Sequence, residues 1–170
     1  MPGQDRLNFI QQTLARAGTG WTQAAAVAVL AALPVAAFAQ SFQDWQLTCA
    51  DGTCALSQTI AAEGEVWLAT IRLQLGGDIL LAEVLVPSGV HLASGIFLQS
   101  GAAMVAADWQ RCTPQVCRAA LGLDDGMTAQ WQRGVAAQVR YRPAPDAPVV
   151  AFDLSLMGLT AGLAALEVAR

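Results

Sequence analysis

Residues 47–56 read LTCADGTCAL, and this stretch decides how the chain begins to fold. Asp51-Gly52 is typical of a two-residue type I′ hairpin turn, because both central positions of that turn need a positive φ. Cys49 and Cys54 then face each other just beyond the turn, as a non-hydrogen-bonded antiparallel pair with neighbouring side chains. The stretch therefore predicts a β-hairpin whose two cysteines lie within reach of a disulfide.

The chain has two further cysteines, Cys112 and Cys117, with the same spacing. They flank TPQV, in which Pro114 fits the second position of a type I turn. Four cysteines allow three connectivities, and a long-range bridge such as Cys49–Cys112 would gain more from loop closure, about 4 kcal/mol against about 2. The turn residues favour the two local disulfides, Cys49–Cys54 and Cys112–Cys117.

The same cysteine spacing leaves two other kinds of site open. C-x4-C lies within the broad range of zinc ligand spacings, although zinc ribbons and knuckles more often have two-residue gaps. A thioredoxin-like redox pair needs C-x-x-C, which the sequence lacks. Export to an oxidising compartment would favour structural disulfides over a zinc site and over a redox pair.

The N-terminus indicates such export. Residues 1–20 are polar and carry two arginines, residues 24–33 are an uncharged apolar run, and Ala37-Phe38-Ala39 has the form of a signal-peptidase site. We therefore expect a secretory signal peptide over residues 1–39, cleaved after Ala39. The apolar run is about ten residues long and a membrane span needs roughly 20, so an uncleaved anchor is the weaker interpretation. The expected location is the periplasm, the cell surface or the medium, with no transmembrane span after cleavage.

Cleavage after Ala39 would leave residues 40–170, which we expect to form a single domain. This part carries twelve acidic residues against seven arginines and no lysine. Such a balance argues against a nucleic-acid partner and against binding to an anionic membrane surface.

Short alternating segments with Gly and Pro between them indicate a mainly β fold, a β-sandwich or barrel-like domain with one or two short helices. DDGMTAQWQRG (124–134) is one expected helix, with Asp124 or Asp125 as its N-cap and Gly134 as its stop. SLMGLTAGLAALEVA (155–169) is the other, with Ser155 or Thr160 as candidate N-caps. The expected strands are DWQLTC, CALSQTI, EVWLATIRLQL, ILLAEVLVP, VHLASG, IFLQSG, AMVAADWQRC, CRAALGL, VAAQVRYRP and VVAFDLSL.

We find no catalytic constellation in the sequence. His91 is the only histidine and reads as a strand residue, with Val90 and Leu92 on the opposite face. The acidic pair Asp124-Asp125 is better explained as a helix cap than as a calcium or catalytic site. We therefore expect no catalytic, cofactor-binding or metal-binding residues and no cofactor. A carboxylate-dependent hydrolase using Asp124, Asp125 or Glu83 is the alternative.

Two groups of side chains could still bind a ligand. Arg140 and Arg142 alternate with Val139 and Tyr141, which places both arginines on one strand face, either solvated or as an anion-binding patch. The tryptophans are expected to pack in the core rather than to stack on a ligand. Those within residues 40–170 are Trp45, Trp67, Trp109 and Trp131.

Four segments together resemble a known family. They are FQDWQLTC (42–49), VPSGVHLASGIFLQSG (86–101), CTPQVCRAALGL (112–123) and SLMGLTAGLAAL (155–166). In this order they are similar to the invasion-associated locus B (invasion protein B) family of exported bacterial proteins, from about Phe42 to Leu166. Val116 stands where the family pattern has glycine, and Leu159 where it has phenylalanine.

The resemblance implies a small, mostly β extracytoplasmic domain with no established reaction. We therefore expect an exported, non-enzymatic binding or interaction module, whose partner is an unidentified envelope or host protein. A role in invasion or host interaction is implied by the family name alone.

Overall fold

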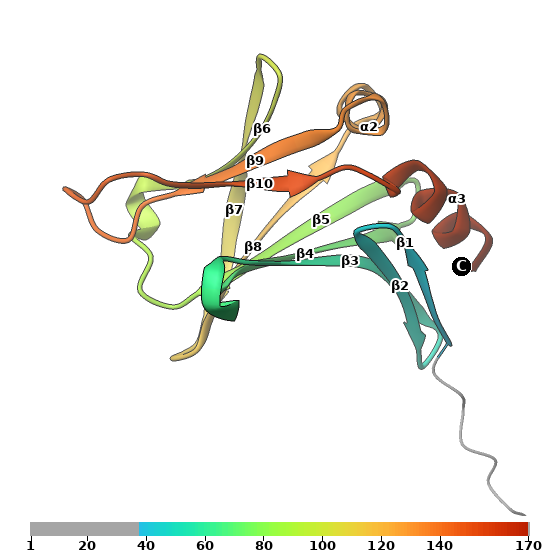
Figure 1. Ribbon diagram of the computed structural model, residues 1–170, viewed down its shortest axis with the longest axis horizontal. Coiled ribbons are helices and arrows are strands. Elements are labelled where there is room, and N and C mark those ends of the chain that lie inside the picture. Colours follow the sequence, from blue (N-terminus) through green and yellow to red (C-terminus); the bar gives the residue numbers. More distant parts are fainter. Residues whose placement is uncertain (1–37, 170) are drawn as a thin grey trace, which may run out of the picture. The chain divides into compact units, whose positions relative to one another are not determined.

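Ten antiparallel strands form one continuous, bent sheet in the computed structural model, which describes residues 38–169 (Figure 1). These residues belong to one structural unit, Val35–Arg170. The strand order is β1-β2-β3-β4-β5-β8-β7-β6-β9-β10. The strands are β1 (Phe38–Phe42), β2 (Trp45–Ala50), β3 (Thr53–Ala61), β4 (Trp67–Gly76), β5 (Ile79–Pro87), β6 (Ile96–Ser100), β7 (Ala103–Cys112), β8 (Val116–Leu123), β9 (Ala136–Tyr141) and β10 (Val150–Ser155).

The sheet turns back on itself at β7. The second half of β7 pairs with β8, whereas its first half pairs with β6, which in turn pairs with β9. Figure 1 shows β9 and β10 lying across from β3, β4 and β5, with β7 running between the two layers. The expected mainly β fold with two α-helices is confirmed, as a bent sheet and not as a closed barrel.

The core fills the space between the two halves of this sheet. Alternation sends every second side chain inward, as in β5, where Leu80, Ala82, Val84 and Val86 are buried. The same core cluster takes Leu98 from β6 and residues from β2, β4, β9 and β10. A sandwich-like core therefore arises from a single sheet.

The Asp51-Gly52 turn has the predicted conformation. Asp51 has φ 50° and Gly52 has φ 75°, and β2 pairs with β3 so that Cys49 lies opposite Cys54. Two disulfides are present in the structure, Cys49–Cys54 and Cys112–Cys117, each with Cα atoms 4.0 Å apart. Each disulfide therefore closes one tight turn between neighbouring strands.

Two helices cover the open end of the bent sheet. Helix α2 (Asp125–Arg133) begins at Asp124, whose Oδ1 accepts a 2.7 Å hydrogen bond from the Met127 amide, and stops at Gly134, as predicted. Helix α3 (Leu159–Ala169) buries three leucines and packs against β1, β2 and β3. Neither helix, nor any other in residues 38–169, has the length and apolar character of a membrane span.

Two expectations about these elements are wrong, and one strand was missed. The expected strand VHLASG (90–95) does not form, because Leu92–Ser94 is a 3-10 turn (η2); a second one, η1, spans Glu63–Glu65. Ser155 is no helix cap but the last residue of β10, and Thr160 lies inside α3, where its hydroxyl donates to the Gln132 carbonyl at 3.2 Å. The strand β1 was not predicted at all.

The predicted signal peptide lies almost wholly outside the described residues. Its cleavage point after Ala39 falls within β1, whose pairing with β2 runs from Phe38 to Phe42. Cleavage there would leave Gln40–Phe42 to pair with β2.

The first and last motifs of the chain meet at one point. The Asp44 carboxylate accepts a 2.6 Å hydrogen bond from the Ser155 hydroxyl, and the Trp45 indole donates to the Ser155 carbonyl at 3.0 Å. The side chain of Gln58 is buried here and pairs with Ser155 as a strand would, donating to its carbonyl at 3.1 Å and accepting from its amide at 3.0 Å. We call these four residues the latch.

A glycine completes this junction. Gly158 has φ 87°, and a Cβ there would overlap the carbonyl oxygen of Phe42. Only glycine therefore fits between the end of β1 and the start of α3. The Asp-Trp and Ser-Leu-x-Gly motifs thus have a structural explanation, since each contacts the other.

Candidate functional site

The carboxylates considered for catalysis do not converge. Asp124 caps α2 through its own Oδ1, and Asp125 follows it in the first turn. Asp125 lines a small depression of about 120 Å³ that also includes Asp78 and Glu167. Among the described residues, no three acidic, histidine or cysteine side chains are arranged to hold a metal ion.

Glu83 belongs to a different surface. It points outward from β5, where Arg118 donates to its Oε1 at 2.6 Å and the guanidinium of Arg72 lies 3.9 Å from its Oε2. A carboxylate held between two arginines is an ion pair in the sheet surface. The three acidic residues of the hydrolase interpretation are therefore not brought together.

His91 is held by local bonds. Its Nδ1 lies 2.8 Å from the Ser94 hydroxyl, and its backbone amide donates to the Arg142 carbonyl at 2.8 Å. The imidazole thus stabilises the η2 turn, and the backbone amide of His91 joins this turn to Arg142, just after β9.

The tryptophans are only partly in the core. Trp45 and Trp131 are each 1% exposed, as predicted. Trp67 and Trp109 are half-buried, and their indoles donate to the Thr70 hydroxyl at 3.0 Å and to the Leu92 carbonyl at 3.1 Å.

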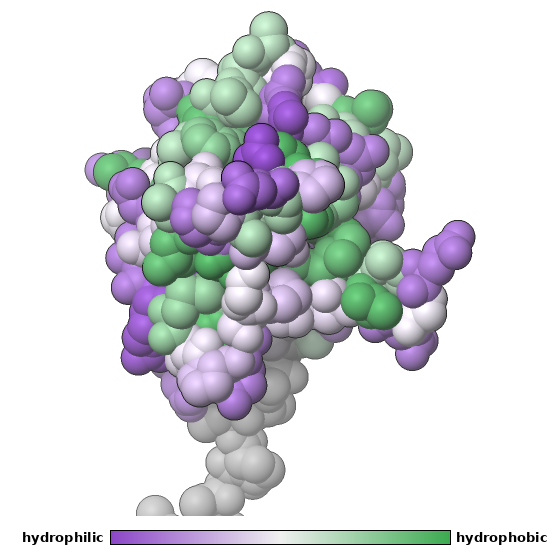
Figure 2. Space-filling model, turned by 90° about the vertical axis from the view of Figure 1, so that its left-hand side faces the viewer, coloured by the Kyte–Doolittle hydropathy of each residue, from purple (hydrophilic) through white to green (hydrophobic). Residues whose placement is uncertain are grey.

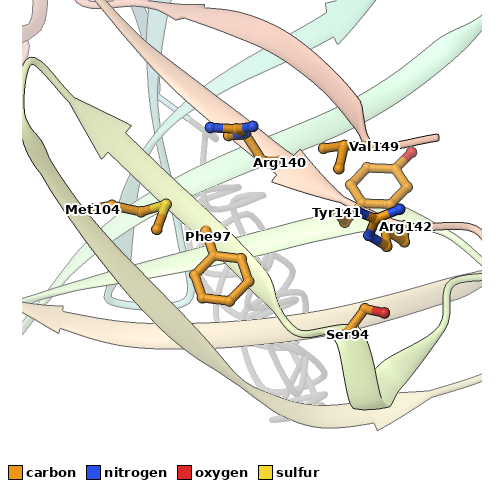
Figure 3. A pocket seen from close by; sticks show the side chains of 7 residues that line it. All are labelled: Ser94, Phe97, Met104, Arg140, Tyr141, Arg142 and Val149. Carbon is orange, nitrogen blue, oxygen red and sulfur yellow. The ribbon is translucent and has the colours of Figure 1, made fainter. Parts of the chain in front are cut away.

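The clearest candidate for a ligand site is a surface pocket of about 240 Å³ over the outer face of β6, β7 and β9. We call it the β6–β9 pocket. Figure 3 shows Arg140 on β9 and Arg142 just after it, with Phe97 contributed by β6 and Met104 by β7. Its lining residues are Ser94, Phe97, Met104, Arg140, Tyr141, Arg142 and Val149.

Strand register explains why these side chains meet. Phe97 lies directly opposite Arg140 in the β6–β9 pair, so both point to the outer face, while the next residue, Tyr141, turns inward. In Figure 2, which views the side where η2 and the β9–β10 loop lie in Figure 1, hydrophobic and hydrophilic residues are interspersed. The lining of the pocket likewise contains both hydrophobic and hydrophilic side chains.

The two arginines have unused binding capacity. Both are half-buried; Arg140 donates to Gln99 Oε1 at 3.0 Å and Arg142 to the Ala147 carbonyl at 2.5 Å, both neutral acceptors. Within residues 38–169, Glu83 is the only carboxylate that pairs with an arginine. A guanidinium has five donors, so most of those in the pocket are available to an acidic ligand.

Burial also changes the pKa of Tyr141, the one tyrosine that lines the pocket. Desolvation raises the pKa of Tyr141 above its ordinary value of 10.0, because the phenolate is poorly solvated there. Its ring packs edge-on against Phe152, with the ring centroids 6.2 Å apart. Tyr141 is therefore a neutral wall of the pocket at physiological pH.

Sequence reasoning found only part of this pocket. Arg140 and Arg142 stood out through their alternation along one strand. Phe97, Met104 and Val149 were missed, because nothing in the sequence reveals that β6 lies between β7 and β9 in the sheet.

A bent antiparallel sheet with two turn-closing disulfides and a terminal helix defines a class of small, disulfide-bonded β proteins. The family model described as "Invasion associated locus B (IalB) protein" matches residues 45–167, and the chain belongs to this family. The resemblance drawn from the sequence motifs is thus confirmed.

One solved structure shows the same fold. It is the crystal structure of invasion associated protein B from Bartonella henselae, which matches with a TM-score of 0.71 and 18% sequence identity. The match covers 77% of this chain and 96% of that one. The comparison with curated proteins finds no match.

Proposed function

We propose that the chain is an exported, non-enzymatic module of the bacterial envelope, and that it binds an acidic ligand with an apolar part in the β6–β9 pocket. Membership of the IalB family supports an invasion-associated protein, and the family description names no reaction. Two disulfides suit an oxidising compartment outside the cytoplasm. A role in invasion or host contact follows the family name and belongs to this proposal.

The pairing of Arg140 and Arg142 with apolar walls carries the ligand proposal. Half-burial makes an unneutralised guanidinium unfavourable, so an anion that reaches both arginines offsets this cost. Phe97, Met104 and Val149 would contact the apolar part of the same ligand, and most ligand sites combine a few polar groups with such a lining.

Three simple probes test this chemistry. Octanoate has an acidic head and an apolar chain, octanol has only the chain, and acetate has only the acid. We expect calorimetry to show binding of octanoate that is at least about tenfold tighter than that of either other probe. Equal affinity for octanoate and octanol would contradict the role of the arginines.

A matched pair of variants locates the binding. Arg140→Gln combined with Arg142→Gln should weaken octanoate binding, whereas Arg133→Gln, at the exposed end of α2, should leave it unchanged. The same proteins serve as baits for envelope extracts, in which a natural ligand is retained by the native chain and lost with the double variant.

Export is tested separately. Mass spectrometry of the protein recovered from the periplasm should find Gln40 as its first residue. Protease treatment of intact cells distinguishes a surface protein, which is digested, from a periplasmic one, which is protected. An intact N-terminus in the cytoplasmic fraction would contradict export.

A further inference from the structure

A second group of arginines lies on the outer face of the other half of the sheet, away from the β6–β9 pocket. Arg72, Arg111 and Arg118 line a pocket of about 190 Å³ together with Glu83 and with Leu85, Thr113 and Val116. The described residues carry twice as many acids as arginines, so three arginines around one carboxylate are a local exception. We call this group the β4–β8 cluster.

The carboxylate neutralises only part of this charge. Glu83 is shared by Arg118 at 2.6 Å and Arg72 at 3.9 Å, and its side chain is 18% exposed. The guanidinium of Arg111 has no hydrogen-bond or ion-pair partner among residues 38–169. Three guanidiniums and one carboxylate leave an excess of two positive charges.

The position of Arg111 depends on a β-bulge. From Asp108 to Trp109, β7 pairs regularly with β8, but the register then shifts by one residue at Gln110. Without that shift, Arg111 would lie opposite Cys117 and would point toward the buried face. The bulge instead places Arg111 directly opposite Arg118 on the outer face.

The Cys112–Cys117 disulfide holds this register. The two cysteines are the next pair along β7 and β8, so the bond fixes the alignment that puts Arg111 beside Arg118. The turn is also anchored to the residue that follows β5, since the Ser88 hydroxyl donates to the Pro114 carbonyl at 2.6 Å. These two links therefore fix the backbone that carries Arg111 and Arg118.

Fold stability does not explain this arrangement. Like charges directly opposite in an antiparallel pair are destabilising. The bulge is needed to align Cys112 with Cys117, but nothing in that alignment requires an arginine at position 111. The repulsion between Arg111 and Arg118 would be relieved if an anion were bound between the two guanidiniums.

We infer that the β4–β8 cluster binds a doubly charged oxyanion of the phosphate type, held by Arg111 and Arg118 and dependent on the Cys112–Cys117 disulfide. The excess of two positive charges matches a dianion, and the planar guanidinium is suited to phosphate oxygens. The phosphate can come from a lipid headgroup or from a free phosphate, and the chemistry of the site is the same for both.

The first experiment titrates the oxidised protein with sodium phosphate against sodium chloride at constant ionic strength. The arginine Nε–Hε resonances of the labelled protein are followed by NMR. We expect saturable shifts at Arg111 and Arg118 with phosphate only. Arg111→Gln should weaken the phosphate affinity by about tenfold, and Arg133→Gln should leave it unchanged. Equal behaviour of the two variants would overturn the inference.

A stability measurement distinguishes a binding role of Arg111 from a structural role. Because Arg111→Gln removes a like-charge pair, it should raise the urea midpoint of unfolding while it weakens phosphate binding. A lower midpoint together with lost binding would indicate a structural role for Arg111 and would overturn the inference.

The two disulfides provide a matched control. The pair Cys112→Ser with Cys117→Ser should lose phosphate affinity, whereas Cys49→Ser with Cys54→Ser should keep it. If both pairs retain full affinity, the dependence on the disulfide is wrong. Arg111→Gln tests the site itself whether or not the first pair folds.

The source of the phosphate is decided by sedimentation with vesicles of phosphatidylcholine with or without phosphatidic acid. Sedimentation only with phosphatidic acid, reversed by free phosphate, identifies a lipid headgroup. Phosphate binding without sedimentation identifies a soluble phosphate. Absence of both kinds of binding overturns the inference.

Discussion

At the scale of single residues, Gln58 is the side chain on which the closure of the sheet depends. Its amide makes both hydrogen bonds of a strand pair with Ser155 and also donates to the Asp44 carbonyl at 3.2 Å. The turn after β1 is thus joined to the end of β10 by side-chain bonds of Asp44, Trp45 and Gln58 instead of by backbone pairing. An amide is suited to this because it donates and accepts at once.

Gln58→Ala should lower the free energy of unfolding by about 2–3 kcal/mol, because the half-buried backbone amide and carbonyl of Ser155 both lose a partner. Urea unfolding measures this loss. Gln46→Ala is the control, since Gln46 is exposed on the adjacent strand β2 and its change should have almost no effect. Equal effects of the two substitutions would refute the latch.

Gly158→Ala should destabilise more strongly, by at least about 3 kcal/mol, because a methyl group has no space beside the Phe42 carbonyl. Gly89→Ala separates this overlap from backbone strain. Gly89 has a similar φ of 91° but no atom within 4 Å of the added Cβ, so only strain of about 1–2 kcal/mol is expected there. Thermal unfolding of both variants tests the difference.

Tyr141 is the only tyrosine, so its phenolate absorbance reports one group. In the unfolded chain it loses its proton near pH 10.0, whereas burial in the native fold raises its pKa. The native state therefore keeps a proton that the unfolded state has lost. Stability is complete below pH 10.0 and falls as the pH rises from there through the native pKa.

A spectrophotometric titration of native and urea-unfolded protein measures both pKa values. Tyr141→Phe should abolish this part of the alkaline loss of stability. A native pKa at or below that of the unfolded chain would contradict the burial argument.

At the scale of elements, the hairpins were predictable because their signals are local. Asp51-Gly52 specifies its turn through two adjacent residues, and Asp124 caps α2 through a bond to an amide three residues away. The β6–β9 pocket could not be predicted, because it depends on which strands are neighbours. The bulge at Gln110 has no Gly or Pro to mark it.

Two errors at this scale also have physical causes. The stretch around His91 alternates as a strand does, but its bonds to Ser94 and Arg142 hold a turn in place of a ladder. The small residues around Ala39 fit a signal-peptidase site and a strand equally well. The segment was assigned to the signal peptide, so β1 was not predicted.

Peptide mapping without reduction tests the proposed disulfide pairing. We expect linked or looped fragments that contain Cys49 with Cys54 and Cys112 with Cys117. A fragment joining Cys49 to Cys112 would refute the pairing. Replacing the first pair by serine should lower the free energy of unfolding by about 2 kcal/mol, as expected for a loop of this length.

At the scale of the whole molecule, the fold is closed by contacts between distant parts of the chain. Gln58 and Ser155 are 97 residues apart, and Asp44 and Ser155 are 111 apart. Domains dominated by such contacts fold in milliseconds to seconds, because long loops must close before the contacts can form.

We therefore expect the latch to form after the folding transition state. Gln58→Ala should then increase the unfolding rate and leave the folding rate nearly unchanged. Stopped-flow measurements across a range of urea concentrations give both rates. A slower folding rate with an unchanged unfolding rate would place the latch in the nucleus instead.

The latch also has a consequence for the proposed export of the chain. An emerging polypeptide cannot complete this fold until Ser155 and Gly158 have been synthesised, because these residues pack against the Asp-Trp segment near its start. A chain in transit would therefore remain incompletely folded for most of its passage through a translocation channel. It would complete its fold on the far side of the membrane, once its last residues have emerged.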